Sequence, residues 1–284
     1  MRLSHNMYSM SIFKNYKSTL EVNSKTLTNI STGLKINSAK DNPNKIAQSD
    51  SLKLQILARS AAQSNIQDTN SMLQTFDGAL QEMNNNLSRL TQLTVSAASE
   101  SNTEHDREII QKEIDQILKG LDEITENTDF NGVKLSAKNA TAAITDPTKP
   151  VKYKDTVIGE LSGEKMGIPF YDISTDGLGI NGIKVTSTKD ASEAITKVEE
   201  ATKIVSGIRS KYGALQSRIE DTYTSVDEIN ENLSRAQSSI ADADIAEEML
   251  NYSRTNIMYQ SAISLMAQSN KFPQDVLNIL SSVK

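Results

Sequence analysis

The sequence predicts a mainly α-helical protein, a long antiparallel helical bundle or coiled coil with a small central insert that contains β-hairpins. Apolar residues recur at alternating spacings of three and four through most of both halves of the chain, which is the pattern of a heptad seam. Aromatic residues make up only 5% of the 284 residues, Trp is absent, and the mean hydropathy is −0.44. Long helices packed in pairs fit this composition better than one thick globular core.

The first predicted helix carries an a/d seam near the N-terminus. Its members are Phe13, Leu20, Leu27 and Leu34, with Tyr16, Asn23 and Ile30 three residues further on. A second seam consists of Ile66, Leu73, Leu80, Leu87 and Thr94, with Phe76, Met83, Leu90 and Ala97 at the partner positions. A third consists of Ile110, Ile114, Ile117, Leu121 and Ile124. Thr103 followed by Asp106 predicts a capping box at the start of this third helix.

Residues 131–188 interrupt the helical pattern. They hold seven of the twelve Gly and three of the five Pro of the chain. Alternating runs in VKYKDTVIGEL (151–161) and NGIKVTS (181–187) predict strands in hairpins. The two helical ends of the chain therefore enclose one small β-containing insert.

A fourth seam extends over residues 198–240, about 43 residues or roughly 65 Å of helix. It loses step at Ala241–Asp244 and restarts one phase later as a fifth seam, which we expect to end at Pro273. The members of the fifth seam are Ile245, Met249, Tyr252, Tyr259, Ile263 and Met266. Because one straight helix cannot keep both seams facing the same partner, we expect a change of partner at the Ala-Asp-Ala-Asp stretch.

Composition argues against several classes of function. The net charge is −6 without a block of like charges, which disfavours nucleic acid as a partner. No apolar run approaches the ~18 residues of a membrane span, and no Sec-type signal peptide is recognisable, so we expect no membrane partner. Cysteine is absent, which excludes thiol catalysis and disulfides.

Catalytic and metal sites are not predicted either. His5 and His105 are the only histidines and lie on separate segments. Asp242 and Asp244 fit a solvated linker better than a pair of calcium ligands. With no Ser–His–Asp set and no Gly-rich phosphate loop, we expect neither cofactor nor metal, and no enzyme.

The C-terminal stretch RAQSSIADADIAEEMLNYSRTNIMYQSAISLMAQSNKFPQDVLNIL (235–280) resembles the C-terminal signature of bacterial flagellin. The N-terminal half resembles the same family in STGLKINSAKDNP (31–43), LQTFDGALQEMNNNLSRLTQLTVSAAS (73–99) and TDFNGVKL (128–135). About 230 residues carry the resemblance, in order, at both ends of the chain. The segment DNPNKIAQSD (41–50) departs from the flagellin pattern and slightly resembles hook–filament junction proteins instead.

The resemblance implies a structural subunit that polymerises into the flagellar filament, with a hook–filament junction adaptor as the alternative. It implies an inner coiled-coil domain from residues 1–40 and 241–284, and a rod domain from residues 41–135 and 189–240. Residues 136–188 would be a short surface insert, without large outer domains. Each terminal seam is amphipathic and short of partners, so we expect residues 1–40 and 241–284 to be poorly ordered in the free monomer. The expected assembly seam consists of Phe13, Leu20, Leu27, Leu34, Ile245, Met249, Tyr252, Tyr259, Ile263 and Met266.

The resemblance also implies partners and a location. The partners are other copies in a helical homopolymer, hook-associated and cap proteins, and a flagellar export chaperone bound to the C-terminal segment. Secretion would follow the flagellar type III route to the extracellular filament. O-linked glycans on Ser and Thr of the outer surface, within residues 136–176, are a further implication, whereas Asn139-Ala140-Thr141 reads as an incidental N-glycosylation motif.

A host Toll-like receptor is the last implied partner. The positions that match the family's receptor-binding residues are Arg89, Leu93 and Glu113. Arg89 and Leu93 are four residues apart and share a helix face. Both lie mostly off the second seam, so we expect them to be free to face a partner.

Overall fold

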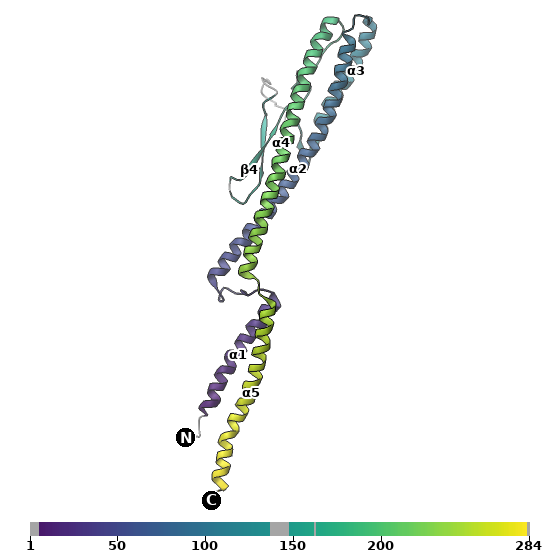
Figure 1. Ribbon diagram of the computed structural model, residues 1–284. Coiled ribbons are helices and arrows are strands. Elements are labelled where there is room, and N and C mark those ends of the chain that lie inside the picture. Colours follow the sequence, from purple (N-terminus) through teal and green to yellow (C-terminus); the bar gives the residue numbers. More distant parts are fainter. Residues whose placement is uncertain (1–5, 137–147, 162, 283–284) are drawn as a thin grey trace. The chain divides into compact units, whose positions relative to one another are not determined.

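The computed structural model describes residues 6–136, 148–161 and 163–282 and is mainly helical (Figure 1). The helices of the described residues are α1 (Met7–Thr32), α2 (Pro43–Ala97), α3 (Glu104–Asn127), α4 (Thr188–Ala241) and α5 (Ile245–Ser282). The strands are β1 (Asp129–Phe130), β2 (Val133–Lys134), β3 (Lys152–Val157) and β4 (Lys165–Phe170). The predicted class, mainly α with a small hairpin-containing insert, is confirmed.

The chain divides into two compact units. One consists of Met1–Ile56 and Asn232–Lys284, and the other of Leu57–Glu231. These divisions, after Ile56 and after Glu231, differ in position from the domain boundaries expected at residues 40 and 240. The assignment to an inner coiled coil and a rod stays a prediction.

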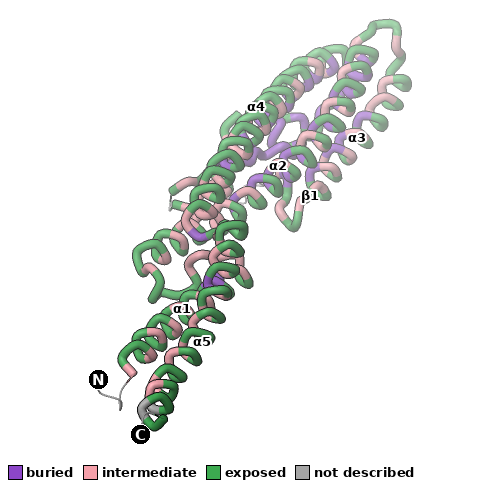
Figure 2. Tube along the Cα trace, turned by 60° about the horizontal axis from the view of Figure 1, so that its bottom comes forward, coloured by how far each residue is buried: buried purple, intermediate pink, exposed green. Residues whose placement is uncertain are grey.

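The core of the Leu57–Glu231 unit follows the predicted seams. Figure 2 shows buried residues gathered along α2, α3 and α4. All members of the second seam are buried, from Ile66 to Ala97. In α3, Ile114 and Leu121 are buried and the other seam members pack against them. The capping box of Thr103 and Asp106 is present, with both reciprocal hydrogen bonds formed.

The prediction of a continuous fourth seam is wrong at its C-terminal end. It is buried or half-buried from Val198 to Val226, but Ile229 is 43% exposed and Ala236 is exposed. The insert covers α2 as far as Arg59, whose Nε lies 3.4 Å from Glu160 Oε2. An unbroken apolar period therefore predicts the helix correctly and overstates its burial.

The insert forms two antiparallel hairpins. Asn131 and Gly132 connect β1 to β2 with positive φ angles of 49° and 77°, the combination that a tight two-residue hairpin requires. β3 and β4 pair from Lys152↔Phe170 to Val157↔Lys165, which confirms a strand within 151–161. Along β4, Met166, Ile168 and Phe170 are buried, and this face anchors the hairpin on the helices.

The strand predicted at 181–187 is not formed. Gln111 of α3 occupies the backbone groups that a neighbouring strand would need: its Oε1 accepts from Val185 N at 2.8 Å and its Nε2 donates to Ile183 O at 3.0 Å. Ile183 and Val185 are buried, so this part of the insert is core rather than surface.

The expectation of a surface location is also wrong for Phe170–Thr175, all of which are buried. Ser174 and Thr175 are therefore closed to glycan attachment. Asn139, Ala140 and Thr141 lie outside the described residues.

The terminal helices belong to the other unit. α1 ends at Gly33, which adopts a left-handed conformation with φ 73° and donates its N–H to Asn29 O at 2.8 Å. The break between α4 and α5 falls at the predicted Ala-Asp-Ala-Asp stretch, where Asp244 Oδ1 accepts from Ala246 N at 2.9 Å and caps α5. The expected end at Pro273 is wrong, because α5 continues through Pro273 to Ser282.

Candidate assembly surface

α1 and α5 form an antiparallel pair whose facing sides are mostly half-buried and carry both polar and apolar residues. On α1 the facing residues alternate at three and four: Ser9, Ile12, Tyr16, Thr19, Asn23, Thr26 and Ile30. On α5 they do the same: Glu248, Tyr252, Thr255, Tyr259, Ala262, Met266, Ser269, Pro273 and Val276. Both stripes repeat every 3.5 residues on average, the period of a coiled coil.

Hydrogen bonds connect the two helices along their length. Asn23 Nδ2 donates to Thr255 Oγ1 at 2.9 Å, and Asn29 Nδ2 donates to Glu248 Oε1 at 2.9 Å. The Tyr16 and Tyr259 rings lie 6.2 Å apart between their centroids. Small polar residues at heptad spacing could have revealed this stripe, but a search restricted to apolar residues passes over Thr19 and Thr26.

The outward sides of both helices carry the large apolar side chains. On α1 the exposed ones are Met7, Tyr8, Met10, Phe13, Leu20, Val22 and Leu27. On α5 they are Ile245, Met249, Leu250, Ile257, Met258, Ile263, Leu265, Phe272 and Ile279. Most of the large apolar side chains of the pair therefore lie on its outward sides, whereas a soluble helix pair normally buries them. Exposed apolar surface of this extent marks an interaction site.

The ten seam residues predicted from the sequence divide between these two sides. Tyr252, Tyr259 and Met266 are half-buried on the stripe that faces α1, and Leu34 is half-buried where α1 ends. The others are exposed on the outward side: Phe13, Leu20, Leu27, Ile245, Met249 and Ile263.

A short bridge joins the end of α1 to the break between α4 and α5. Leu34 pairs with Asp242 in an antiparallel bridge. Lys35 N donates to Ala241 O and Ala243 N donates to Gly33 O, each at 2.8 Å. Both interruptions of the helical pattern therefore meet at one place, and each supplies backbone partners for the other.

The loop after this bridge is held by Asp41. Its carboxylate lies 2.8 Å from Lys25 Nζ and accepts the N–H groups of Asn37 and Ser38 at 3.2 and 3.1 Å. The hydrogen bond from Lys25, followed by that from Asn37, holds the pKa of Asp41 below its ordinary value. The loop thereby returns to α1 before α2 begins.

The residues matched to a receptor site lie on α2 and α3. Arg89 Nη2 and Nε donate to Glu113 Oε1 at 2.7 and 3.1 Å, and about half of each side chain is exposed. Leu93 is only 7% exposed, so the expectation that it faces a partner freely is wrong. The Arg89–Glu113 pair places α3 on this side of α2, and the neighbouring Leu93 joins the core.

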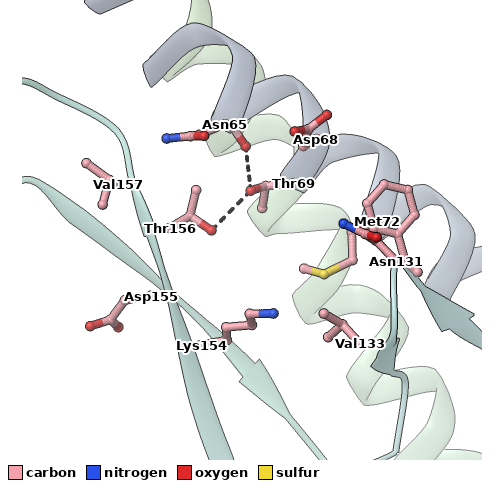
Figure 3. Close-up of a pocket in the computed structure, with 11 residues that line it drawn as sticks. Asn65, Asp68, Thr69, Met72, Asn131, Val133, Lys154, Asp155, Thr156 and Val157 are labelled. Atoms are coloured by element: carbon pink, nitrogen blue, oxygen red, sulfur yellow. Dashed lines mark hydrogen bonds between the residues drawn. The ribbon is translucent and has the colours of Figure 1, made fainter. Parts of the chain in front are cut away.

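A cleft of about 360 Å³ opens between α2 and the two hairpins (Figure 3). Thr69 on α2 and Thr156 on β3 face each other there, with their hydroxyl oxygens 3.0 Å apart. Thr69 Oγ1 also donates to Asn65 O at 2.7 Å. The hydroxyl pair ties the hairpin to the helix, and the described lining contains no histidine.

Two further predictions concern metal and membrane binding. His105 is exposed beside Glu108, with Nδ1 3.7 Å from Oε2, and His5 lies outside the described residues. Among residues 6–136, 148–161 and 163–282, no acidic or histidine cluster could hold a metal ion. The described helices include none that is long and apolar enough to span a bilayer.

Comparison with known proteins gives a consistent result. Residues 3–141 match the family model described as the bacterial flagellin N-terminal helical region, and residues 195–280 match that of the C-terminal helical region. The chain is 33% identical to a flagellin of Halalkalibacterium halodurans over 282 residues, covering 99% of this chain and 100% of the relative. It is 32% identical to a flagellin of Bacillus subtilis over 306 residues, with the same coverage. A putative flagellar hook-associated protein from Vibrio parahaemolyticus shares the fold, with a TM-score of 0.60 at 14% identity over 71% of this chain and 100% of that one.

Proposed function

Because the chain belongs to the bacterial flagellin family and is a structural subunit of the bacterial flagellar filament, we propose that the outward sides of α1 and α5 are the surface through which copies of it polymerise. The filament is an extracellular assembly of many copies, in association with hook-associated proteins. The relatives matched along the whole chain are flagellins, so the junction adaptor is the less supported alternative.

One observation carries the proposal: most of the large apolar side chains of the terminal pair are exposed on its outward sides. Burying a Leu, Ile, Phe or Met side chain contributes about 1.5–3 kcal/mol, whereas association costs about 4–15 kcal/mol. Seven exposed large apolar side chains on α1 and nine on α5 are enough to offset that cost. Within this proposal, residues 1–40 and 241–284 form the inner coiled-coil domain.

Seeded polymerisation of the full chain tests the surface. Leu27 is 52% exposed, so Leu27→Asp should leave the helical signal of the monomer unchanged while preventing elongation on filament seeds. Ser71→Asp, which places the same charge at an exposed position of α2, is the matched control and should elongate normally. Normal elongation of Leu27→Asp would show that this side of α1 stays outside the subunit contacts.

Export requires the same apolar surface to be covered before assembly. We propose that a flagellar chaperone binds the outward side of α5 and that export follows the type III route. Titration of the purified chaperone against the full chain and a chain that ends at Ala241 tests this. Binding should need residues 242–284, and equal binding to both chains would contradict it.

Receptor recognition is a separate proposal. The exposed Arg89–Glu113 pair supports contact with a host Toll-like receptor, and Leu93 would support it from the core by holding α2 against α3. A cell reporter assay should then respond to the wild-type monomer and lose most of the response in Arg89→Ala and Glu113→Ala. An unchanged response in the double variant would reject the assignment.

A further inference from the structure

Pro273 lies inside α5 and leaves one backbone carbonyl of that helix without its helical donor. In an α-helix the N–H of each residue donates to the carbonyl four residues earlier, which here is the carbonyl of Ser269. Proline has no N–H, and its ring also crowds that carbonyl. α5 nevertheless continues to Ser282, so Ser269 O needs a donor from elsewhere.

Asn6, near the other end of the chain, supplies this donor. Its Nδ2 donates to Ser269 O at 2.8 Å and to Ser269 Oγ at 3.0 Å, with a longer contact of 3.4 Å to Asn270 Oδ1. Its Oδ1 accepts from Ser9 N at 3.1 Å and caps α1. One amide thus satisfies an unpaired donor at the start of α1 and an unpaired acceptor inside α5.

The choice of asparagine follows from this double role. Asp and Ser cap helices about as well as Asn does. An Asp carboxylate has no donor, and a Ser hydroxyl has one oxygen in place of the separate oxygen and nitrogen of the amide. Among the residues suited to an N-cap, Asn therefore fits both ends of this contact.

We propose that the pairing of Asn6 with the carbonyl freed by Pro273 holds the N-terminal end of α1 against α5 in the pair that polymerises. The backbone bridge between Leu34 and Asp242 holds the other end of this pair. The bonds of Asn23 and Asn29 join side chains, whose groups can turn to water when a partner is lost. The Ser269 carbonyl has no helical donor, so the Asn6 amide is the group that satisfies it and keeps the two ends together.

This inference rests on the proposal that the terminal pair is the assembly surface, and seeded polymerisation of the full chain tests it. Asn6→Ser keeps a neutral capping oxygen and removes Nδ2, so the concentration of free subunit at steady state should rise about tenfold. Pro273→Ala returns an N–H to the Ser269 carbonyl and should polymerise like the wild type. In the double variant, Pro273→Ala should remove the defect of Asn6→Ser.

Asn23→Ser is the matched control. It removes the bond to Thr255, which has no proline near it, so Pro273→Ala should not repair its defect. Hydrogen exchange of assembled filaments gives a second measurement: amides of residues 274–280 should exchange faster in Asn6→Ser and return to wild-type rates in the double variant.

Two results would overturn the inference. One is polymerisation of Asn6→Ser at the wild-type concentration, and the other is a defect of equal size with and without Pro273. Leu27→Asp distinguishes failure of the inference about Asn6 from failure of the proposed assembly surface. Normal elongation of that variant would remove the surface as a cause of assembly, whatever the behaviour of Asn6.

Discussion

Tyr212 places a titratable phenol inside the core. Its ring lies 6.5 Å from that of Phe76 and 6.2 Å from that of Tyr171, and its hydroxyl donates to Pro169 O at 2.9 Å. Burial, with a smaller contribution from Tyr171, raises the pKa of Tyr212 well above its ordinary value of 10.0. The neutral phenol thereby holds β4 on α4.

We expect Tyr212 to make stability fall at alkaline pH. A group whose pKa is raised by folding contributes its full stabilisation below the pKa of the unfolded chain, near 10, and loses it as the pH rises toward the folded value. The free energy of unfolding should then fall by about 1.4 kcal/mol per pH unit above pH 10.

Urea unfolding of the wild type and Tyr212→Phe between pH 8 and 11 measures this fall. Tyr212→Phe should be about 1 kcal/mol less stable at pH 8 and should lose less stability above pH 10. Parallel pH profiles would contradict the assignment.

Single residues also mark the limit of sequence-based prediction. The capping box at Thr103 follows from local chemistry, and it is present. Leu93 lies off the apolar seam of its own helix. Its burial depends on where α3 packs, and the sequence of α2 does not predict that position. The role of Asn6 depends on a proline more than 260 residues away along the chain.

Among the helices, α4 has unequal burial along one continuous seam. Val226 is 6% exposed, whereas Leu233 is half-buried. A charge at Val226 would lie without a partner in an apolar interface, so Val226→Asp should cost about 3 kcal/mol or more of unfolding free energy. Leu233→Asp should cost less than half as much, because water reaches that position. Thermal unfolding followed by circular dichroism compares the two, and equal losses would show that the seam is buried to its end.

The segment between β4 and α4 shows why the insert was predicted only in part. Alternation identified β3 correctly, although all its residues except the half-buried Thr156 are exposed. The alternation in 181–187 is of the same kind, but the hydrogen-bonding partner there is the side chain of Gln111 on α3. Alternation along the sequence predicts an extended segment with two different faces. It does not predict whether the hydrogen-bonding partner of that segment is a strand or a side chain.

For the whole molecule, the two units predict separable losses. Removal of residues 245–284 deletes α5 and leaves the Leu57–Glu231 unit complete. Polymerisation should disappear, while the thermal midpoint of the remaining helical signal should stay within a few degrees of that of the full chain. Filaments of normal form from the shortened chain would show that α5 is dispensable for assembly. Collapse of the helical signal would show that the two units are not independent.

The predictability of this fold follows from the same division. Seams covered by the chain's own helices, such as Ile66–Ala97, could be read from apolar spacing alone. In the terminal pair many large apolar residues, such as Leu27 and Met249, are exposed, so the same method identified the helices and left the partner of these side chains open. Apolar spacing finds the surface that must be covered, without stating which molecule covers it.

The pairing of α1 with α5 also implies a delay during synthesis, because the two helices lie far apart along the chain. Partners such as Asn29 and Glu248 are 219 residues apart, and Asn6 and Ser269 are 263 apart. At about 5–20 residues per second, a ribosome needs roughly 10–50 s to make the second helix after the first. During that interval the first helix to emerge lacks its partner helix, and the pair can close only after α5 has been made. The terminal helices of the newly made chain are therefore unpaired at the stage when a carrier protein or an export channel would bind them.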